Sequence, residues 1–342
     1  MFHPNFTIGA DVEVFGKLPG QDFHKSLCGL IGGTKDKPKQ LQHLNDGYMV
    51  QEDNVSLEYN IPVCSSKEEF ISSIRTMRNE CHNILNSFSF ELSPNSSFSF
   101  DNEELRHPNA MVFGCEPDFN AWKRTENSKP IAKDKNLRTC GGHIHIGTNE
   151  VDMIEGIQYM DLFLGVPSIL VDNSPSSAKR RELYGKAGAM RPKPYGFEYR
   201  VLSNFWMFED RLVDWIYQQT RTAMLYSTDK RLVTSEKAKL IQKAINNNDE
   251  QIAKKLIDEF GMSLPMSSEE WKEQVEKEKI YKQKNAEAWL AKTRGKKVSF
   301  SESVSQFVSS QPQPTVTSFL QGATIPNMYT WSNPPVPPLS SD

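Results

Sequence analysis

The sequence predicts an α+β protein, in which helices flank an antiparallel β-sheet and a C-terminal helical segment follows. Three observations support this prediction. Four short runs alternate apolar and polar side chains with a period of two, which is typical of half-buried strands. Residues 226–294 instead read as charged amphipathic helices. Residues 295–342 are rich in Ser, Gln and Pro, which predicts a disordered tail.

The composition is that of an ordinary folded protein of 342 residues, 37% hydrophobic and 24% charged. The formal net charge of -3 gives no overall positive field, so we expect neither nucleic acid nor a lipid surface as a partner. No apolar run approaches the roughly 20 residues of a membrane helix, and the N-terminus does not resemble a signal peptide.

The cysteines are an odd set without CxxC spacing. This pattern argues against a disulfide framework or a zinc knuckle and favours a reducing compartment, so we expect a cytoplasmic location. The five are Cys28, Cys64, Cys81, Cys115 and Cys140.

The first two strand-like runs each carry acidic side chains on one face. In TIGADVEVF, Asp11 and Glu13 share a face and the apolar side chains share the other. In VSLEYNIPV, Glu58 lies on the polar face, and Leu57 and Tyr59 lie on the apolar one.

The next two runs carry imidazole and charged groups in the same pattern. In GGHIHIG, His143 and His145 oppose two isoleucines, and in GFEYRVL, Glu198 and Arg200 oppose aromatic and apolar side chains. The glycines around the histidine run are compatible with close approach of the backbone to a ligand.

An antiparallel sheet with one solvated face would explain any one of these runs. Solvated faces are usually filled by Lys, Thr, Ser and Gln, however, whereas these carry Asp, Glu, His, Asn and Arg. Carboxylates 4 Å apart repel by about 1 kcal/mol in water and about 4 kcal/mol at an effective dielectric of about 20. If the four strands are neighbours, their shared face favours a divalent cation, and oxygen ligands suit Mg²⁺ or Mn²⁺ better than structural zinc.

Residues 176–200, SSAKRRELYGKAGAMRPKPYGFEYR, form a cationic stretch. Its three glycines and two prolines predict a loop rather than a helix. Beside an acidic metal site, such a loop suits polyphosphate chemistry, in which cations stabilise the charge on a transferred phosphoryl group. A basic surface loop that touches RNA is the alternative. The chain contains neither the P-loop motif GxxxxGK[ST] nor a GxSxG elbow.

The runs GADVEVF, DNVSLEYNIPV, TCGGHIHIG, RRELYGKAGAMRPKPYG and FEYRVLSNFW, in this order, resemble the phage-type COOH–NH2 ligases, or amidoligases. These are distant relatives of glutamine synthetase and glutamate–cysteine ligase. The resemblance covers about residues 5–225. It implies a glutamine-synthetase-like antiparallel sheet, curved into a funnel that binds ATP and Mg²⁺ or Mn²⁺. It also implies that ATP phosphorylates a carboxylate, and that an amine then displaces phosphate to form an amide.

The resemblance further implies roles for the residues of the matched motifs. The metal ligands would be Asp11, Glu13, Glu58 and Glu198, although Asp11 replaces a glutamate of glutamine synthetase. The nucleotide-binding residues would be His143, His145, Arg180, Arg181, Lys186 and Arg191. The catalytic residues would be Arg200, His143 and Arg191, and the sequence does not decide which histidine faces the phosphates. Asp53 or Glu52 is a candidate general base for the amine, although acidic residues before a strand are often turn or cap residues.

We expect three regions along the chain: a catalytic domain over residues 1–225, a charged helical segment over 226–294 and a tail over 295–342. The helical segment would pack on the catalytic domain or mediate contacts. Within it, Gly261 is placed to end one helix, and Ser267 with Glu270 forms a capping box that begins the next.

Two other classes of function stay open. One is a non-catalytic binding or inhibitory phage protein that retains the ligase fold. The other is a metal-dependent hydrolase that uses Asp11, Glu13, Glu58 and His143. For a ligase, the expected partners are small-molecule or peptide carboxylate and amine substrates, in the cytoplasm of the host cell if the protein is phage-encoded. The sequence selects neither the substrates nor an oligomeric state, and it is compatible with an oligomer.

Overall fold

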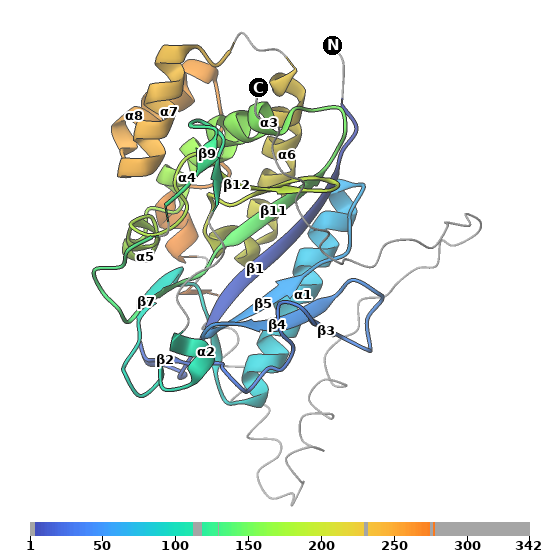
Figure 1. Cartoon of the computed structure of the whole chain (residues 1–342), viewed down its shortest axis with the longest axis vertical. Helices are drawn as coiled ribbons and strands as arrows, with labels where there is room; N and C mark the ends of the chain where they lie inside the picture. The colour runs from blue at the N-terminus through green and yellow to red at the C-terminus, as the bar shows by residue number, and fades with distance from the viewer. Residues whose placement is uncertain (1–3, 112–117, 129, 229–231, 274–275, 278–342) are drawn as a thin grey trace, which may run out of the picture. The chain divides into compact units, whose positions relative to one another are not determined.

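The computed structural model of this chain describes residues 4–111, 118–128, 130–228, 232–273 and 276–277. The predicted tail and most of the last predicted helix lie outside these residues. The described part confirms the α+β prediction, because helices pack against an open antiparallel sheet (Figure 1).

In the described part of the chain, eleven strands form one antiparallel sheet whose two end strands do not pair with each other. The main order is β3-β4-β5-β1-β11-β13-β12-β8-β9, and β2 and β6 also pair with β1. These strands are β1 (Thr7–Lys17), β2 (His24–Lys25), β3 (Lys39–Gln40), β4 (Met49–Asp53), β5 (Ser56–Asn60), β6 (Glu91–Ser93), β8 (Phe119–Asn120), β9 (Thr125–Glu126), β11 (Gly142–Gly147), β12 (Ala189–Lys193) and β13 (Gly196–Tyr199). A separate pair joins β7 (Ser97–Ser99) to β10 (Leu137–Thr139).

The four strands with the unusual polar faces are consecutive neighbours in the order β5-β1-β11-β13. The adjacency that the sequence left open is therefore confirmed. The directly opposed pairs are Asp11 with His143, Glu13 with Glu58, and His145 with Glu198. Because opposed residues share a face and side chains alternate along each strand, these polar groups all lie on one side of the sheet.

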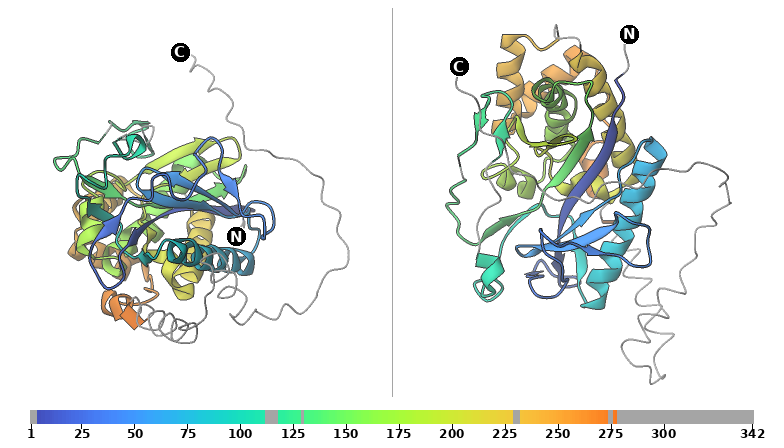
Figure 2. Two further views of the ribbon diagram at one scale, coloured as in Figure 1. Left: turned by 90° about the horizontal axis from the view of Figure 1, so that it is seen from below. Right: turned by 45° about the vertical axis from the view of Figure 1, so that its right-hand side comes forward.

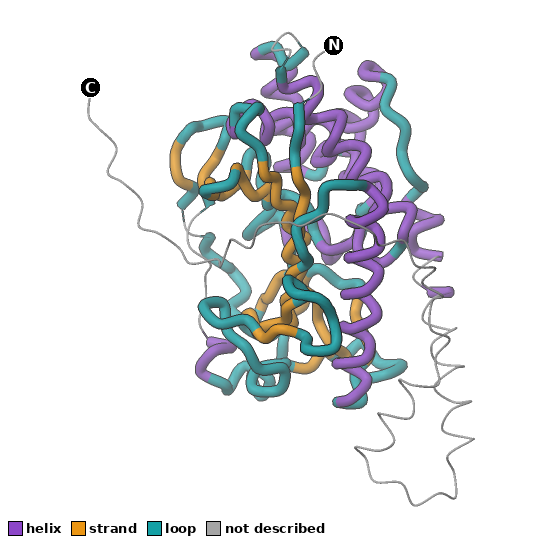
Figure 3. The backbone as a smooth tube through the Cα atoms, turned by 90° about the vertical axis from the view of Figure 1, so that its right-hand side faces the viewer, coloured by secondary structure: helices purple, strands orange, loops and turns teal. Residues whose placement is uncertain are grey.

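The other face of the same strands forms the hydrophobic core, with Val12, Tyr59, Ile144 and Phe197 all fully buried. Helices cover this face, and Figure 3 shows the long helices on one side of the strands and most loops on the other. They are α1 (Lys67–Ser87), α3 (Met153–Met160), α6 (Asp210–Ser227) and the 3₁₀ segment Asn204–Phe208; the short α2 (Pro108–Met111) lies apart. Figure 2 shows α1 and α6 side by side.

Helix α1 illustrates how local sequence sets a covering element. Ser66 caps its first turn by accepting the amide N–H of Glu69. Buried side chains then recur every three or four residues, at Phe70, Ile74 and Met77 and on to Leu85. This spacing keeps one apolar stripe facing the sheet.

The run from α3 through α4 is a continuous helical rod. A π-helical segment, Asp161–Gly165, joins α3 to α4 (Val166–Val171). This run, Met153–Val171, spans 19 residues with a mean hydropathy of 1.3, so the expectation that no apolar run approaches membrane length was wrong. Its most apolar window is 78% buried inside the protein, which is typical of a core helix, so length and composition here are weak evidence for a membrane span.

Residues 176–200 are not the continuous loop that the sequence predicts. Ser174 caps a short helix, α5 (Pro175–Arg180), and residues 189–193 form β12, which pairs with β13. The glycines do mark the turn between these elements, since Gly185 and Gly188 have φ of +70° and +77°. Only Ala189 and Met190 of β12 pair with β8. Pro192 lies beyond them, on a part of the strand that β8 does not pair with, and a strand tolerates a residue without an N–H there.

The C-terminal helices are α7 (Ser235–Asn247) and α8 (Glu250–Phe260), which pack against each other and against α4 (Figure 1). The predicted helix end at Gly261 is confirmed, with φ of +60°. The capping box is also confirmed: Glu270 N donates to Ser267 Oγ at 3.1 Å, and Ser267 N donates to Glu270 Oε2 at 2.7 Å.

Candidate active site

A pocket of about 520 Å³ opens on the polar face of the sheet. Glu13 and His143 from the central strands line it, together with Arg200, which directly follows β13. A glycine-bearing turn, residues 33–36, lines it from the opposite side. Nothing in the local sequence connects this turn with a site, because its contact with the pocket depends on the pairing of β3 with β4.

The first charged group at the pocket consists of three carboxylates, from Glu13, Asp53 and Glu58. One oxygen from each lies within 4.8 Å of the other two. Gly141 N donates to Glu13 Oε2 at 2.7 Å, and Gln51 Nε2 donates to Glu58 Oε2 at 2.8 Å. We call this group the acidic cluster.

The electrostatics of the acidic cluster favour a bound cation. Burial, reinforced by the Asp53 carboxylate, raises the pKa of Glu13 to about 8. Burial and the neighbouring carboxylates of Asp11 and Asp53 also raise the pKa of Glu58 well above its usual value. Because burial and nearby carboxylates disfavour the ionised forms of Glu13 and Glu58, a divalent cation among the three carboxylates would relieve that penalty, and carboxylate oxygens are the ligands that Mg²⁺ or Mn²⁺ prefers.

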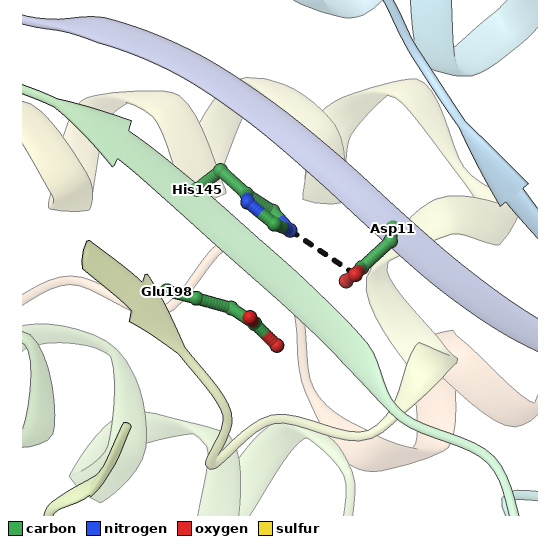
Figure 4. Close-up of side chains that lie close together, drawn as sticks. All are labelled: Asp11, His145 and Glu198. Atoms are coloured by element: carbon green, nitrogen blue, oxygen red, sulfur yellow. Dashed lines mark ion pairs between the residues drawn. The ribbon is translucent and has the colours of Figure 1, made fainter. Parts of the chain in front are cut away.

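The second group joins Asp11, His145 and Glu198, whose ligand atoms also lie within 4.8 Å of one another. Figure 4 shows these three side chains converging from three adjacent strands. His143 Nδ1 lies 3.1 Å from Asp11 Oδ1, and His145 Nε2 lies 3.1 Å from Asp11 Oδ2. Burial acts to raise the pKa of Asp11, but the two imidazoles hold it well below its usual range. We call this group the histidine cluster.

Glu198, in the histidine cluster, is completely buried and surrounded by cations. Lys193 Nζ lies 3.1 Å and Arg191 Nη1 3.6 Å from Glu198 Oε2, and Arg200 Nη1 donates to Oε1. Burial acts to raise the pKa of Glu198, but the Arg200 guanidinium and the imidazoles of His145 and His143 together outweigh it and hold this pKa well below its usual range. The carboxylate of Glu198 is therefore balanced by cations, whereas burial and neighbouring carboxylates raise the pKa values of Glu13 and Glu58 in the acidic cluster.

The two histidines occupy different environments. His143 lines the pocket with its Nδ1 3.3 Å from Arg200 Nη1, and burial and Arg200 lower its pKa. His145 instead contacts the Tyr195 hydroxyl, and the Asp11 carboxylate offsets the effect of burial and raises its pKa. Burial and Arg200 therefore favour the neutral form of His143 at the pocket wall, whereas the Asp11 carboxylate favours the protonated form of His145 in the metal-free protein.

The cationic residues implied by the resemblance are divided by the fold. Arg180 lines the pocket and is 2% exposed, with its Nη1 donating to the Val201 carbonyl at 2.9 Å. Arg181 instead donates to Asn248 Oδ1 at 2.8 Å, and Lys186 Nζ donates to the Asn246 carbonyl at 3.3 Å. The structure thus brings Arg180, Arg191 and Arg200 to the site and directs Arg181 and Lys186 toward α7.

Three site residues escaped the sequence reasoning or were only touched by it. Asp118 accepts from Arg200 Nε at 2.6 Å, and nothing in its local sequence indicates this role. Lys193 had a usable signal, because it lies two residues from Arg191 and so on the same face of β12. Asp53 joins the acidic cluster, whereas Glu52 accepts the amides of Gly29, Ile31 and Gly32 and therefore acts as a turn cap.

The donor sets fit two divalent cations. Each cluster supplies three side-chain ligands of oxygen or imidazole type, which leaves positions for substrate oxygens in an octahedral shell. The pocket beside them presents Arg180 and Arg200, which suit an anion. The arrangement can therefore bind an anionic substrate next to bound metal.

Comparison with known proteins agrees with this chemistry. Residues 132–293 match the family model described as phage phiEco32-like COOH·NH2 ligase-type 2. The match includes β11, β12 and β13 and extends through α7 and α8, beyond the region to which we limited the resemblance. It begins after β1 and β5, so Asp11, Glu13 and Glu58 lie outside it. The chain has no match among curated proteins.

Proposed function

We propose that the chain is an ATP-dependent carboxylate–amine ligase that works through an acyl phosphate, since residues 132–293 match the phage-type COOH–NH2 ligase family. The observation that carries this proposal is the pairing of two metal-ligand clusters with a cationic pocket wall on one sheet face. Activation of a carboxylate requires charge neutralisation, and the Arg180 and Arg200 guanidinium groups at this pocket can contribute to it.

We assign the residues at the pocket to two roles, metal binding and anion binding. Glu13, Asp53 and Glu58 would hold one Mg²⁺ or Mn²⁺, and Asp11, His145 and Glu198 would hold a second. Bound there, the metals would neutralise phosphate oxygens and orient the terminal phosphate toward the acceptor. Arg180 and Arg200 would bind the transferred phosphoryl group or the substrate carboxylate.

The proposed reaction has two steps. A carboxylate oxygen of the first substrate attacks the γ-phosphorus of ATP, the bond to the β-phosphate oxygen breaks, and ADP leaves. An amine nitrogen then attacks the acyl carbon, phosphate leaves with the former carboxylate oxygen, and the nitrogen loses a proton to form the amide. Asp53 lines the pocket, and the carboxylate oxygen that it does not give to the metal can accept this proton, directly or through water.

Holding both substrates in one pocket favours this sequence over hydrolysis, because the amine lies next to the acyl phosphate when it forms. The substrates we propose are a small-molecule or peptide carboxylate and an amine. If the protein is phage-encoded, they would meet it in the host cytoplasm.

The test is ADP release from ATP and Mg²⁺ by the purified protein against pools of amino acids and peptides, with Glu13→Gln as the matched inactive control. ADP that appears only when a carboxylate pool and an amine pool are both present supports the proposal. Metal-dependent cleavage of a pool without ATP favours the hydrolase instead. No ADP release, together with no shift in Tm on addition of Mg·ATP, favours the non-catalytic binding protein.

A further inference from the structure

The end of α7 contacts the part of the chain that forms one wall of the pocket. This wall, residues 180–188, contributes Arg180, Leu183 and Tyr184 to the pocket lining. It begins at the end of α5 and leads into β12. Neither the sequence nor the proposed chemistry assigns a role to the contact with α7.

Three hydrogen bonds join the wall to α7. The Ala187 amide donates to Asn246 Oδ1 at 2.8 Å, and Lys186 Nζ donates to the Asn246 carbonyl at 3.3 Å. Arg181 Nη1 donates to Asn248 Oδ1 at 2.8 Å. Two asparagines therefore hold the wall near both of its ends.

The local structure of α7 makes these asparagines rigid. Asn248 is the C-cap of α7 and has φ of +52°, a left-handed conformation that asparagine tolerates better than most side chains. Ile245 is fully buried and packs closely against Gly165. A Cβ added at Gly165 would lie only 2.7 Å from Ile245 Cδ1. The end of α7 is thereby packed onto the core rod that contains Asp161–Gly165.

The wall itself has little room to adjust. Gly185 has φ of +70°, and a Cβ there would overlap Arg180 Nη1 and lie 2.6 Å from the Val201 carbonyl oxygen. On the far side of the turn, Gly188 N donates to the buried carboxylate of Asp161 at 2.6 Å. The turn between Ala187 and Arg180 is closely packed. We therefore expect a displacement of the Ala187 backbone to displace the Arg180 side chain as well.

We propose that Asn246 and Asn248 are positioning residues, which hold the pocket wall so that the Arg180 guanidinium faces the anionic part of the substrate. This inference rests on the proposed function in one respect, namely that the anion is the phosphate chain of Mg·ATP. It makes the helical pair α7–α8 a part of the nucleotide site rather than an accessory segment.

The test compares Asn246→Asp, which keeps an acceptor for Ala187 N, with Asn246→Leu, which removes it at similar volume. Hydrogen exchange of residues 181–188 reports the position of the wall directly. Calorimetric titration with Mg·ATP reports the consequence for binding, and Mn²⁺ titration without nucleotide reports the acidic cluster. Asn248→Gly keeps the left-handed conformation and removes the Arg181 bond, so it provides a second variant that preserves the fold.

For Asn246→Leu and Asn248→Gly we expect faster exchange at residues 181–188. We also expect Mg·ATP affinity lower by about three- to tenfold, the effect of one lost hydrogen bond, and unchanged Mn²⁺ affinity. The Mg·ATP affinity of Asn246→Asp should stay within about twofold of that of the natural protein, because aspartate keeps an acceptor for the Ala187 amide. Unchanged exchange in both disruptive variants would overturn the inference, as would faster exchange with unchanged Mg·ATP affinity. If the natural protein does not bind Mg·ATP at all, the proposed function fails, while the exchange data still decide whether the asparagines position the wall.

Discussion

His143 faces Asp11 directly across the β1–β11 pair, with its Nδ1 3.1 Å from the Asp11 carboxylate. His145, two residues along the same strand, contacts the other oxygen of that carboxylate at the same distance. Of the two, His143 lines the pocket and lies beside Arg200. One carboxylate thus contacts two imidazoles that lie in different surroundings.

The two histidines should respond differently to substitution. We expect His143→Ala to lower the rate of ADP release by about 10²-fold or more while Mn²⁺ binding changes little, because His143 faces the pocket. His145→Ala should instead weaken metal binding by about 10- to 100-fold, because it removes a ligand of the histidine cluster. ADP release and Mn²⁺ titration on both variants check this, and identical profiles for the two would contradict it.

The acidic cluster should make the metal-free protein less stable as pH rises. The pKa of Glu13 is about 8 in the folded protein and 4.5 for an ordinary glutamate, so the folded chain keeps a proton that the unfolded chain releases. This contribution to stability is fully present below about pH 4.5 and is lost as the pH rises toward 8. We expect Tm in EDTA to fall over this range, and the fall to be smaller in Glu13→Gln.

Divalent metal should reverse this dependence, since it replaces the proton among the three carboxylates. Adding Mg²⁺ or Mn²⁺ should raise Tm more at pH 8 than at pH 6, and binding near neutral pH should release protons. Calorimetry in buffers of different ionisation enthalpy measures that release. A metal-induced stabilisation that does not depend on pH would argue against ligation by Glu13.

Glu198→Gln should destabilise the protein as well as remove a metal ligand. The change takes a counter-charge from Arg191, Lys193 and Arg200, of which Arg200 is 5% exposed. Because Asp118 still pairs with Arg200, we expect a loss of about 2 kcal/mol in the free energy of unfolding rather than complete unfolding. Urea denaturation measures this loss in the free energy of unfolding. His145→Gln is the control, because it changes the same cluster but leaves Glu198 paired with these cations.

The buried Asp161 should be the most sensitive position outside the two clusters. Its carboxylate accepts Trp122 Nε1 at 2.6 Å, Gly188 N at 2.6 Å and the Tyr199 hydroxyl at 2.9 Å. Asp161→Leu leaves three buried donors without their acceptor, so we expect a loss of about 3 kcal/mol or more. Asp161→Asn retains one acceptor oxygen, so its loss in the free energy of unfolding, measured by urea denaturation, should be less than half that of Asp161→Leu. Equal losses for the two variants would contradict this account.

Local pattern was enough to predict the four central strands β1, β5, β11 and β13 and the polar side chains on their shared face. The alternation in TIGADVEVF, VSLEYNIPV, GGHIHIG and GFEYRVL depends only on neighbouring residues, and it assigned Asp11, Glu13, His143 and Glu198 to polar faces. Helix signals at Gly261 and at the capping box of Ser267 also held, because caps act within one turn.

The interpretation of residues 176–200 shows where local pattern fails. Glycine and proline correctly marked the turns there, but β12 forms because β13 offers it a hydrogen-bonding edge. Such pairing depends on a partner strand rather than on the propensity of the segment itself.

By itself, the sequence determined which side chains share a face on each strand, since a two-residue period is a property of the extended backbone. Only the tertiary structure decided which strands are neighbours, and therefore that Asp53, Asp118 and Lys193 join the site while Arg181 and Lys186 bind α7. The physical reason is that strand register and helix docking are set by hydrogen bonds and packing between residues far apart in the chain, which no local period records.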